Sequence, residues 1–276
     1  MNLQQLIKQA TTEYALSLVD ARHLLAHVLA KPTSYLAIHA QEVATPQWVS
    51  DYQAKVQRVA QGEPLAYVTN RSDFMGLDFY VDPHVLIPRP ETEQLVELIT
   101  HHLRQHPAQT MLDMCTGSGC ILISLLHEHP HLQGTGVDVS PQALAVAKQN
   151  ALTNQVASRA HWLRSDLFEQ LPPQTFDLIV SNPPYIPSHE MMTLDAGIMD
   201  HEPHVALHGG DSGLIFYETI SQKAKAYLNP GGRLFFEIGY NQAQAVQAIL
   251  ASNGYTHIHH HPDYAGHDRM IHATYL

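Results

Sequence analysis

The sequence is short of the features that mark secreted, membrane-spanning or disulfide-linked proteins. It has 2 cysteines in 276 residues, Cys115 and Cys120, and both lie in one segment, so they form no disulfide framework. No apolar run reaches the ~20 residues that cross a bilayer, and residues 1–18 lack the basic-then-apolar order of a signal peptide. We therefore expect a protein of the reducing cytoplasm with no membrane partner.

Positive charge is also scarce. The chain has 15 Lys and Arg against 26 Asp and Glu, which gives a formal net charge of −11. Proteins that hold long nucleic acid by its phosphates need a basic face. We therefore expect no stable nucleic-acid partner, although a local basic patch is compatible with this balance. Apolar residues make up 45% of the chain, enough for the core of one large domain or two unequal ones.

The first part of the chain, residues 1–72, is predicted to be a small helical domain. Apolar residues recur at helical spacing after Asp20, which stands where an N-cap is expected. Thr45 and Pro46 suit the start of a further helix. Residues 73–90 then begin with the apolar–polar alternation of a β-hairpin, which we expect to link this domain to the rest of the chain.

Residues 91–276 alternate strands and helices, which predicts an α/β domain with a doubly wound parallel sheet. The strongest strand candidate is 176–181, and a helix is expected over 214–228, ahead of a turn at 230–232. Segment 186–212 reads as an insertion. The other expected strands are 111–114, 136–138, 161–163 and 233–238, followed by two short ones. Ligands of such sheets bind at the carboxyl ends of the strands.

A glycine-rich loop from Asp113 to Gly119 follows the first of these strands, where glycines let a ligand approach a helix N-terminus. Asp138 ends the next strand, where a carboxylate can accept both hydroxyls of a ribose. A simple cap for the following helix is its alternative role. The pattern alone is weak, because nicotinamide enzymes use a similar arrangement. Leu122 occupies the third glycine position of a dinucleotide motif, and no Walker-type lysine is present.

The turn Asn182-Pro183-Pro184-Tyr185, directly after the strand at 176–181, is the most informative motif. Two successive prolines remove two backbone donors and fix two φ angles. Carbonyls in such a turn can accept hydrogen bonds with little competition, the Asn side chain adds an acceptor, and Tyr185 adds a flat surface. The turn therefore favours a planar ligand that carries an NH2 group, such as a carboxamide or the exocyclic amine of a base.

The loop and the turn together resemble the bacterial peptide chain release factor glutamine methyltransferases, a class I S-adenosylmethionine-dependent family. The resemblance extends over essentially the whole chain. It is carried by residues 62–70, 74–93, 113–119, 181–187, 202–214 and 263–269. It implies an N-terminal helical substrate-recognition domain (1–72), a β-hairpin linker (73–90) and a seven-stranded, Rossmann-like methyltransferase domain (91–276). The implied reaction methylates N5 of the glutamine in the Gly-Gly-Gln motif of class 1 release factors.

The resemblance also implies roles for individual residues. Asp138 would hold the ribose hydroxyls, Asp166 and Leu167 would lie near the adenine, and Asn182 would touch both the cofactor and the substrate amide. The implied cofactor-binding set is Cys115, Thr116, Gly117, Ser118, Gly119, Asp138, Asp166, Leu167 and Asn182. The implied substrate-binding set is Asn182, Pro183, Pro184 and Tyr185, of which Asn182, Pro183 and Tyr185 would act in catalysis. Weaker candidates for the rim are Arg89, Glu91 and Thr92.

Several alternatives stay open at this point. Cys115 stands where most members of the family have glycine and resembles the related ribosomal protein L3 glutamine methyltransferases, whereas residues 86–92 resemble the release factor branch. Nucleic-acid adenine or cytosine amino-methyltransferases also use Asn-Pro-Pro-Tyr turns, and a non-catalytic binding module is a further alternative. No metal is expected, because the three neighbouring histidines at 259–261 would point to opposite faces of a strand.

Overall fold

The computed structural model describes residues 1–276. They divide into two compact units, Met1–Arg71 with Ala196–His201, and Ser72–Asp195 with Glu202–Leu276. No helix is both long enough and apolar enough to cross a membrane.

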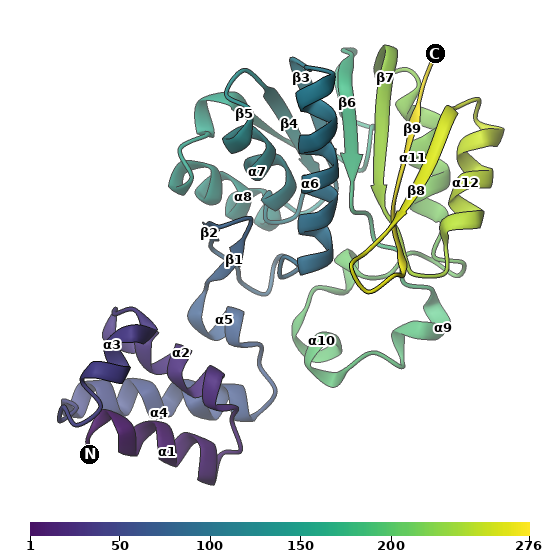
Figure 1. Ribbon diagram of the computed structural model, residues 1–276. Helices are drawn as coiled ribbons and strands as arrows, with labels where there is room; N and C mark the ends of the chain where they lie inside the picture. Colours follow the sequence, from purple (N-terminus) through teal and green to yellow (C-terminus); the bar gives the residue numbers. More distant parts are fainter. The chain divides into compact units, whose positions relative to one another are not determined.

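The first unit is helical and has its own hydrophobic core (Figure 1). Its helices are α1 (Leu3–Glu13), α2 (Leu18–Leu29), α3 (Thr33–Ile38), α4 (Pro46–Ala60), α5 (Leu65–Thr69) and α10 (Ala196–His201). The start predicted for α4 is confirmed, because the Thr45 side chain accepts from the Trp48 amide and Pro46 is the first helical residue. Asp20 is not the N-cap of α2. Ser17 caps this helix by accepting from the Asp20 amide, so α2 begins earlier than expected.

The second unit begins with the hairpin of β1 (Ser72–Phe74) and β2 (Leu77–Phe79) and continues into a seven-stranded sheet. The sheet order is β5-β4-β3-β6-β7-β9-β8; β9 pairs antiparallel with both β7 and β8, and the other pairs are parallel. Its strands are β3 (Thr110–Met114), β4 (Gln133–Asp138), β5 (Ala160–Arg164), β6 (Phe176–Ser181), β7 (Leu228–Glu237), β8 (Thr256–Pro262) and β9 (Asp268–Thr274). The predicted doubly wound α/β fold with a helical N-terminal region is confirmed.

Helices cover both faces of this sheet (Figure 1). The helices α6 (Pro90–Gln105), α7 (Cys120–Glu128) and α8 (Pro141–Thr153) pack on one face, and α11 (Ile215–Ala224) and α12 (Ala243–Ser252) pack on the other. Successive strand residues alternate between the two layers: Phe235 joins the core under α6, and Phe236 joins the core under α11. Two buried layers explain why these strands are apolar throughout.

Two elements near the end of the chain differ from expectation. The predicted helix over 214–228 is too long, because α11 ends at Ala224 and Leu228 already pairs with Phe176 in the sheet. The turn expected at 230–232 lies within β7. A shift in the β6–β7 register between Phe176 and Leu178 accommodates the irregular stretch of β7.

The segment 186–212 contains α9 (Ser188–Met191), α10 and the 3-10 helix His204–Ala206; another 3-10 helix is Ala157–Arg159.

Candidate active site

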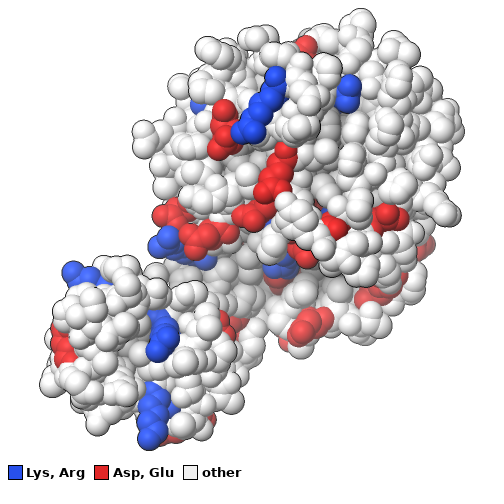
Figure 2. Space-filling model, in the orientation of Figure 1, with Lys and Arg blue, Asp and Glu red and all other residues white.

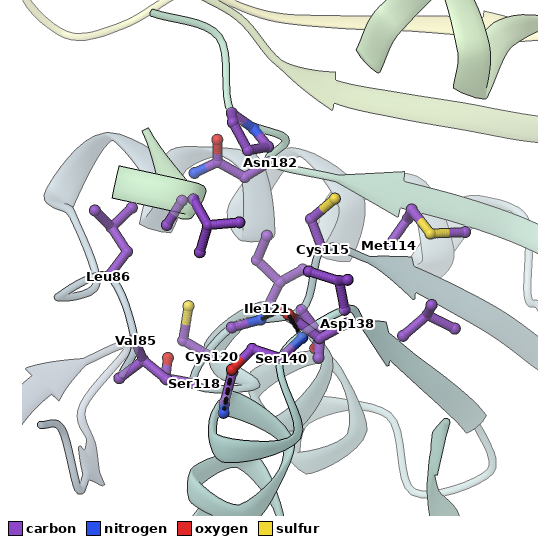
Figure 3. A pocket seen from close by; sticks show the side chains of 18 of the residues that line it. Val85, Leu86, Met114, Cys115, Ser118, Cys120, Ile121, Asp138, Ser140 and Asn182 are labelled. Carbon is purple, nitrogen blue, oxygen red and sulfur yellow. Dashed lines mark hydrogen bonds between the residues drawn. The ribbon is translucent and has the colours of Figure 1, made fainter. Parts of the chain in front are cut away.

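A cavity of about 280 Å³ opens where the carboxyl ends of β3, β4, β5 and β6 meet. In Figure 3, Asn182 lies on one side of this cavity, and Ser118, Asp138 and Ser140 lie on the other. The strand order reverses between β3 and β6, which is where doubly wound sheets bind their ligands. The predicted cofactor residues that line the cavity are Cys115, Thr116, Gly117, Ser118, Asp138, Asp166, Leu167 and Asn182.

The loop between β3 and α7 depends on left-handed backbone at three positions. The φ angle is 62° at Cys115, 55° at Gly117 and 80° at Gly119. A Cβ atom on Gly119 would lie 2.9 Å from Ile123 Cδ1 and 3.0 Å from the Trp162 ring, whereas one on Gly117 would meet nothing within 4 Å. Gly119 therefore does not line the cavity itself but lets α7 pack closely, and Gly117 leaves its backbone open towards a ligand.

Asp138 orders this loop through its carboxylate. Its Oδ2 accepts from the Gly117 amide at 2.9 Å, and its Oδ1 accepts from the Ser140 amide at 2.9 Å. The N-cap of α8 is Ser140, whose Oγ accepts from the Ala143 amide, so Asp138 supports the cap without being it. Burial raises the pKa of Asp138, while the backbone donors lower it. A carboxylate can accept about four hydrogen bonds, so acceptor positions remain for two ligand hydroxyls.

Asp166 and Leu167 follow β5 and line the same cavity. The φ angle of Leu167 is 48°, an uncommon conformation for a residue with a branched side chain. The Asp166 amide donates to Gln170 Oε1 at 3.1 Å, which holds the backbone of this part of the cavity lining.

The turn after β6 carries Asn182 and Pro184 into the cavity lining, whereas Pro183 and Tyr185 do not line it. Pro183 is buried, and its carbonyl accepts no hydrogen bond within residues 1–276. A buried carbonyl without a donor is costly unless a ligand supplies one. Pro183 therefore offers an acceptor that the protein itself leaves unused.

A second glycine-rich segment holds this turn in place. The Ile186 amide donates to the Leu207 carbonyl, and the Gly209 amide donates to the Ile186 carbonyl at 2.8 Å. A Cβ atom on Gly209 would lie 2.7 Å from Tyr185 Cα, and one on Gly213 would lie 2.4 Å from the Tyr185 carbonyl oxygen. The glycines of segment 202–214 thus let its backbone pack directly on the turn formed by residues 182–185.

Thr92 and Glu237 are connected to Asn182 by hydrogen bonds. The sequence motifs gave no role to Glu237. Asn182 Nδ2 donates to Thr92 Oγ1 at 3.3 Å, and Thr92 Oγ1 donates to Glu237 Oε2 at 2.6 Å. The Tyr185 hydroxyl lies 3.5 Å from Glu237 Oε1. Burial raises the pKa of Glu237 to about 7. The signal that could have identified it is an acid that ends a strand, as Asp138 does in β4.

The rim candidates fall into two groups. Arg89 and Thr92 line the cavity, and Glu91 does not. Arg89 pairs with Glu202, whose side chain is 2% exposed. Glu202 was not singled out from the sequence, although it lies in one of the segments that carry the family resemblance. The pair ties the start of α6 to the segment that precedes Val205 and Ala206 in the cavity wall.

The remaining reactive-looking side chains have ordinary explanations. Both cysteines are free, and burial raises the pKa of Cys115 and, to about 12, that of Cys120, so neither is a thiolate near neutral pH. The histidines at 259–261 belong to β8, where His261 Nε2 lies 3.2 Å from His272 Nδ1. No group of three or more His, Cys, Asp or Glu within residues 1–276 is arranged to hold a metal ion.

Comparison with known proteins agrees with this geometry. The family model described as methyltransferase small domain matches residues 91–211, and the one described as PrmC N-terminal domain matches residues 3–69. A solved methyltransferase from Pyrococcus furiosus superposes with a TM-score of 0.55 at 18% identity, over 82% of this chain and 98% of that one. The fold and the site together define a class I methyltransferase.

The curated relatives narrow this class. The release factor glutamine methyltransferase of Cereibacter sphaeroides is 40% identical to this chain and matches 92% of it and 90% of its own length. The bifunctional methyltransferase of Rickettsia felis is 36% identical over 92% of this chain, but the chain spans only about half of that longer protein, 54%. The chain belongs to the release factor glutamine methyltransferase family.

Proposed function

We propose that this protein transfers a methyl group from S-adenosylmethionine to the side-chain nitrogen N5 of the glutamine in the Gly-Gly-Gln motif of class 1 release factors. The observation that carries the proposal is the corner formed by Asn182 and Pro183. Asn182 lines a cavity whose glycine loop and Asp138 suit a nucleoside, and the carbonyl of the adjacent Pro183 has no hydrogen-bond partner within residues 1–276.

The reaction needs an amide nitrogen to act as a nucleophile, and the residues present favour positioning over activation by a base. Abolishing amide conjugation by twisting would cost the full rotation barrier of ~18–20 kcal/mol, which is too much for a few contacts. Two acceptors on the NH2 group, Asn182 Oδ1 and the Pro183 carbonyl, can each contribute ~1–3 kcal/mol in a desolvated site. Correct alignment contributes more, up to ~7–11 kcal/mol.

In this proposal each group has a separate task. S-adenosylmethionine supplies, when bound, a methyl group on a positively charged sulfur. The glycine loop, Asp138, Asp166 and Leu167 hold its nucleoside half. Asn182 and Pro183 orient the substrate NH2 for in-line attack, Tyr185 packs beside the turn, and the methylated nitrogen then releases one proton without needing a strong base.

The organisation of the chain supports the same proposal. We propose that residues 1–72 recognise the release factor, that residues 73–90 link the domains and that residues 91–276 perform the transfer. We also propose a cytoplasmic location, because the proposed substrate is a translation factor and both cysteines are free thiols.

On the face drawn in Figure 2, Lys and Arg are scattered and form no continuous patch, which speaks against nucleic acid as the substrate.

The test is methyl transfer in vitro. Purified protein is incubated with tritium-labelled S-adenosylmethionine and a class 1 release factor, ribosomal protein L3, or DNA and RNA oligonucleotides, and the modified residue is located by mass spectrometry. We expect one methyl group on the Gly-Gly-Gln glutamine. Transfer to L3 or nucleic acid in place of the release factor, or no transfer at all, would refute the proposal.

A further inference from the structure

A hydrogen-bonded chain of three side chains runs from the protein core to the cavity. Glu237, at the carboxyl end of β7, is 1% exposed and does not line the cavity. Thr92, which is 2% exposed, donates to Glu237 Oε2, and Asn182 Nδ2 donates to Thr92 Oγ1. Both Thr92 and Asn182 line the cavity, so the buried carboxylate reaches it only through them.

The chemistry of these groups fixes the direction of every bond in this chain. When Glu237 is ionised it can only accept, so the single hydroxyl proton of Thr92 then points at Oε2, as the 2.6 Å hydrogen bond has it. The lone pairs of Thr92 Oγ1 then face Asn182 and can bind only a donor, which is the NH2 end of its amide. Asn182 Oδ1 is consequently turned away from this chain.

We propose that Glu237 is a positioning residue that, through Thr92, sets the amide orientation of Asn182 so that Oδ1 rather than Nδ2 meets the substrate NH2. The inference rests on the proposed function, because only an NH2-bearing substrate needs an acceptor at this point. With the amide reversed, Asn182 would present two donors to two donors, and the glutamine would be held badly. The buried Glu237 carboxylate therefore determines which atom of the Asn182 amide faces the substrate.

Other residues contact Glu237 at its backbone and at its side chain. The Tyr217 hydroxyl of α11 donates to the Glu237 backbone carbonyl at 3.0 Å, and the Tyr185 hydroxyl lies 3.5 Å from Oε1. The charged and titratable groups that act on this carboxylate from the surrounding elements are Glu91 on α6, Cys120 on α7, Tyr185 after β6, Tyr217 on α11 and Arg269 on β9. Arg269 is the cation among them, and it also pairs with Asp263.

The test combines an isosteric change with a readout of the amide itself. Glu237→Gln keeps the shape of the side chain but introduces a donor, so Thr92 no longer has a fixed direction. We expect kcat on the release factor to fall by about 10- to 100-fold, since misplaced reacting groups cost about that much. Affinity for S-adenosylhomocysteine, measured by calorimetry, should stay within about threefold. The side-chain NH2 signals of Asn182 in 15N NMR spectra should shift and exchange faster with solvent.

Two substitutions at Thr92 provide matched controls. Thr92→Val keeps the volume but removes the hydroxyl and should reproduce the kcat loss, whereas Thr92→Ser keeps the hydroxyl and should retain most of the activity. The double variant Glu237→Gln/Thr92→Val should lose no more than Thr92→Val alone, because the two residues act in series. Losses that multiply, or Thr92→Ser as inactive as Thr92→Val, would overturn the inference.

The outcome is separable from that of the proposed function. If the unmodified protein methylates no release factor, the function is wrong, whatever the variants do. If it is active and Glu237→Gln keeps its full kcat with unchanged Asn182 signals, the function stands and the role of Glu237 is wrong.

Discussion

At the scale of single residues, Asn182 is where cofactor and substrate are expected to meet. Asn182→Ala removes an acceptor from the substrate amide while leaving the glycine loop and Asp138 intact. We predict that kcat falls by about 100-fold or more, as expected for lost alignment, and that the dissociation constant of S-adenosylhomocysteine changes by less than about threefold. Stopped-flow single-turnover rates and calorimetry measure the two quantities. Equal losses in both would place Asn182 in cofactor binding instead.

Replacing Glu237 is predicted to lower activity but to raise the stability of the folded protein. Its pKa is raised from 4.5 to about 7 by burial, so the folded state holds the proton more tightly than the unfolded chain does. Between these two values the folded state binds more protons, and the contribution of this group to stability falls as the pH rises. Above pH 7, burying the ionised carboxylate lowers the free energy of unfolding by about 3 kcal/mol at most, since each pKa unit corresponds to about 1.4 kcal/mol.

Glu237→Gln should therefore stabilise the protein at pH 8 by about 1–3 kcal/mol, with little difference from the unmodified protein at pH 5. Denaturant titrations of both proteins at the two pH values measure this, and taking their difference cancels the contribution of the many histidines. A variant that is less stable than the unmodified protein at pH 8 would mean that the carboxylate serves the fold and not the site.

The same residues show how far a sequence can reveal a site. Asp138 and Asn182 could be placed because the first ends a strand, the second directly follows one, and each belongs to a recognisable pattern. Glu237 also ends a strand, but its proposed role comes from a hydrogen bond to Thr92 in α6, which lies 145 residues earlier in the sequence. Which of several strand-end acids is connected to the turn after β6 is decided by the packing of distant elements, and no local pattern records that.

At the scale of elements, the loop before α7 separates two uses of glycine. Gly117 and Gly119 both have positive φ, so an alanine at either position carries about the same backbone strain of ~1 kcal/mol. Only at Gly119 would the added Cβ also press on Trp162 and Ile123.

We predict that Gly119→Ala costs ~1–3 kcal/mol more unfolding free energy than Gly117→Ala, because overpacking adds to the strain. Gly119→Ala should also weaken S-adenosylhomocysteine binding, since it displaces the start of α7 and with it the loop. Thermal unfolding and calorimetry compare the two variants directly. If both lose the same stability, the crowding at Gly119 is relieved elsewhere and the loop does not depend on that contact.

Elements were predictable from the sequence where local and long-range forces agree. Strand β6 has the predicted bounds because its apolar run is buried on both faces, and the cap of α4 follows from Thr45. The boundary between α11 and β7 was misplaced, because Leu228 continues a helical pattern but pairs with Phe176. Pairing with a neighbouring strand outweighs helical spacing there, and only the assembled sheet reveals it.

At the scale of the whole molecule, the two units have separate hydrophobic cores. One core lies within residues 3–68, and the other two lie within residues 74–273. The cavity is lined entirely by residues of the second unit, from His84 to Phe216. The residues proposed to bind S-adenosylmethionine therefore all belong to the second unit, whereas recognition of a folded protein substrate is proposed to need the N-terminal helices.

Deletion of residues 1–71 should consequently divide the activity into two parts. We predict that residues 72–276 bind S-adenosylhomocysteine within about threefold of the full chain and methylate a short Gly-Gly-Gln peptide at a similar low rate. Methylation of the intact release factor should show a kcat/KM at least about tenfold lower, which corresponds to ~1.4 kcal/mol of lost binding. The peptide is the internal control, because it reports the state of the catalytic turn without the recognition domain. Equal losses on peptide and protein would mean that the N-terminal helices support the site itself and do not select the substrate.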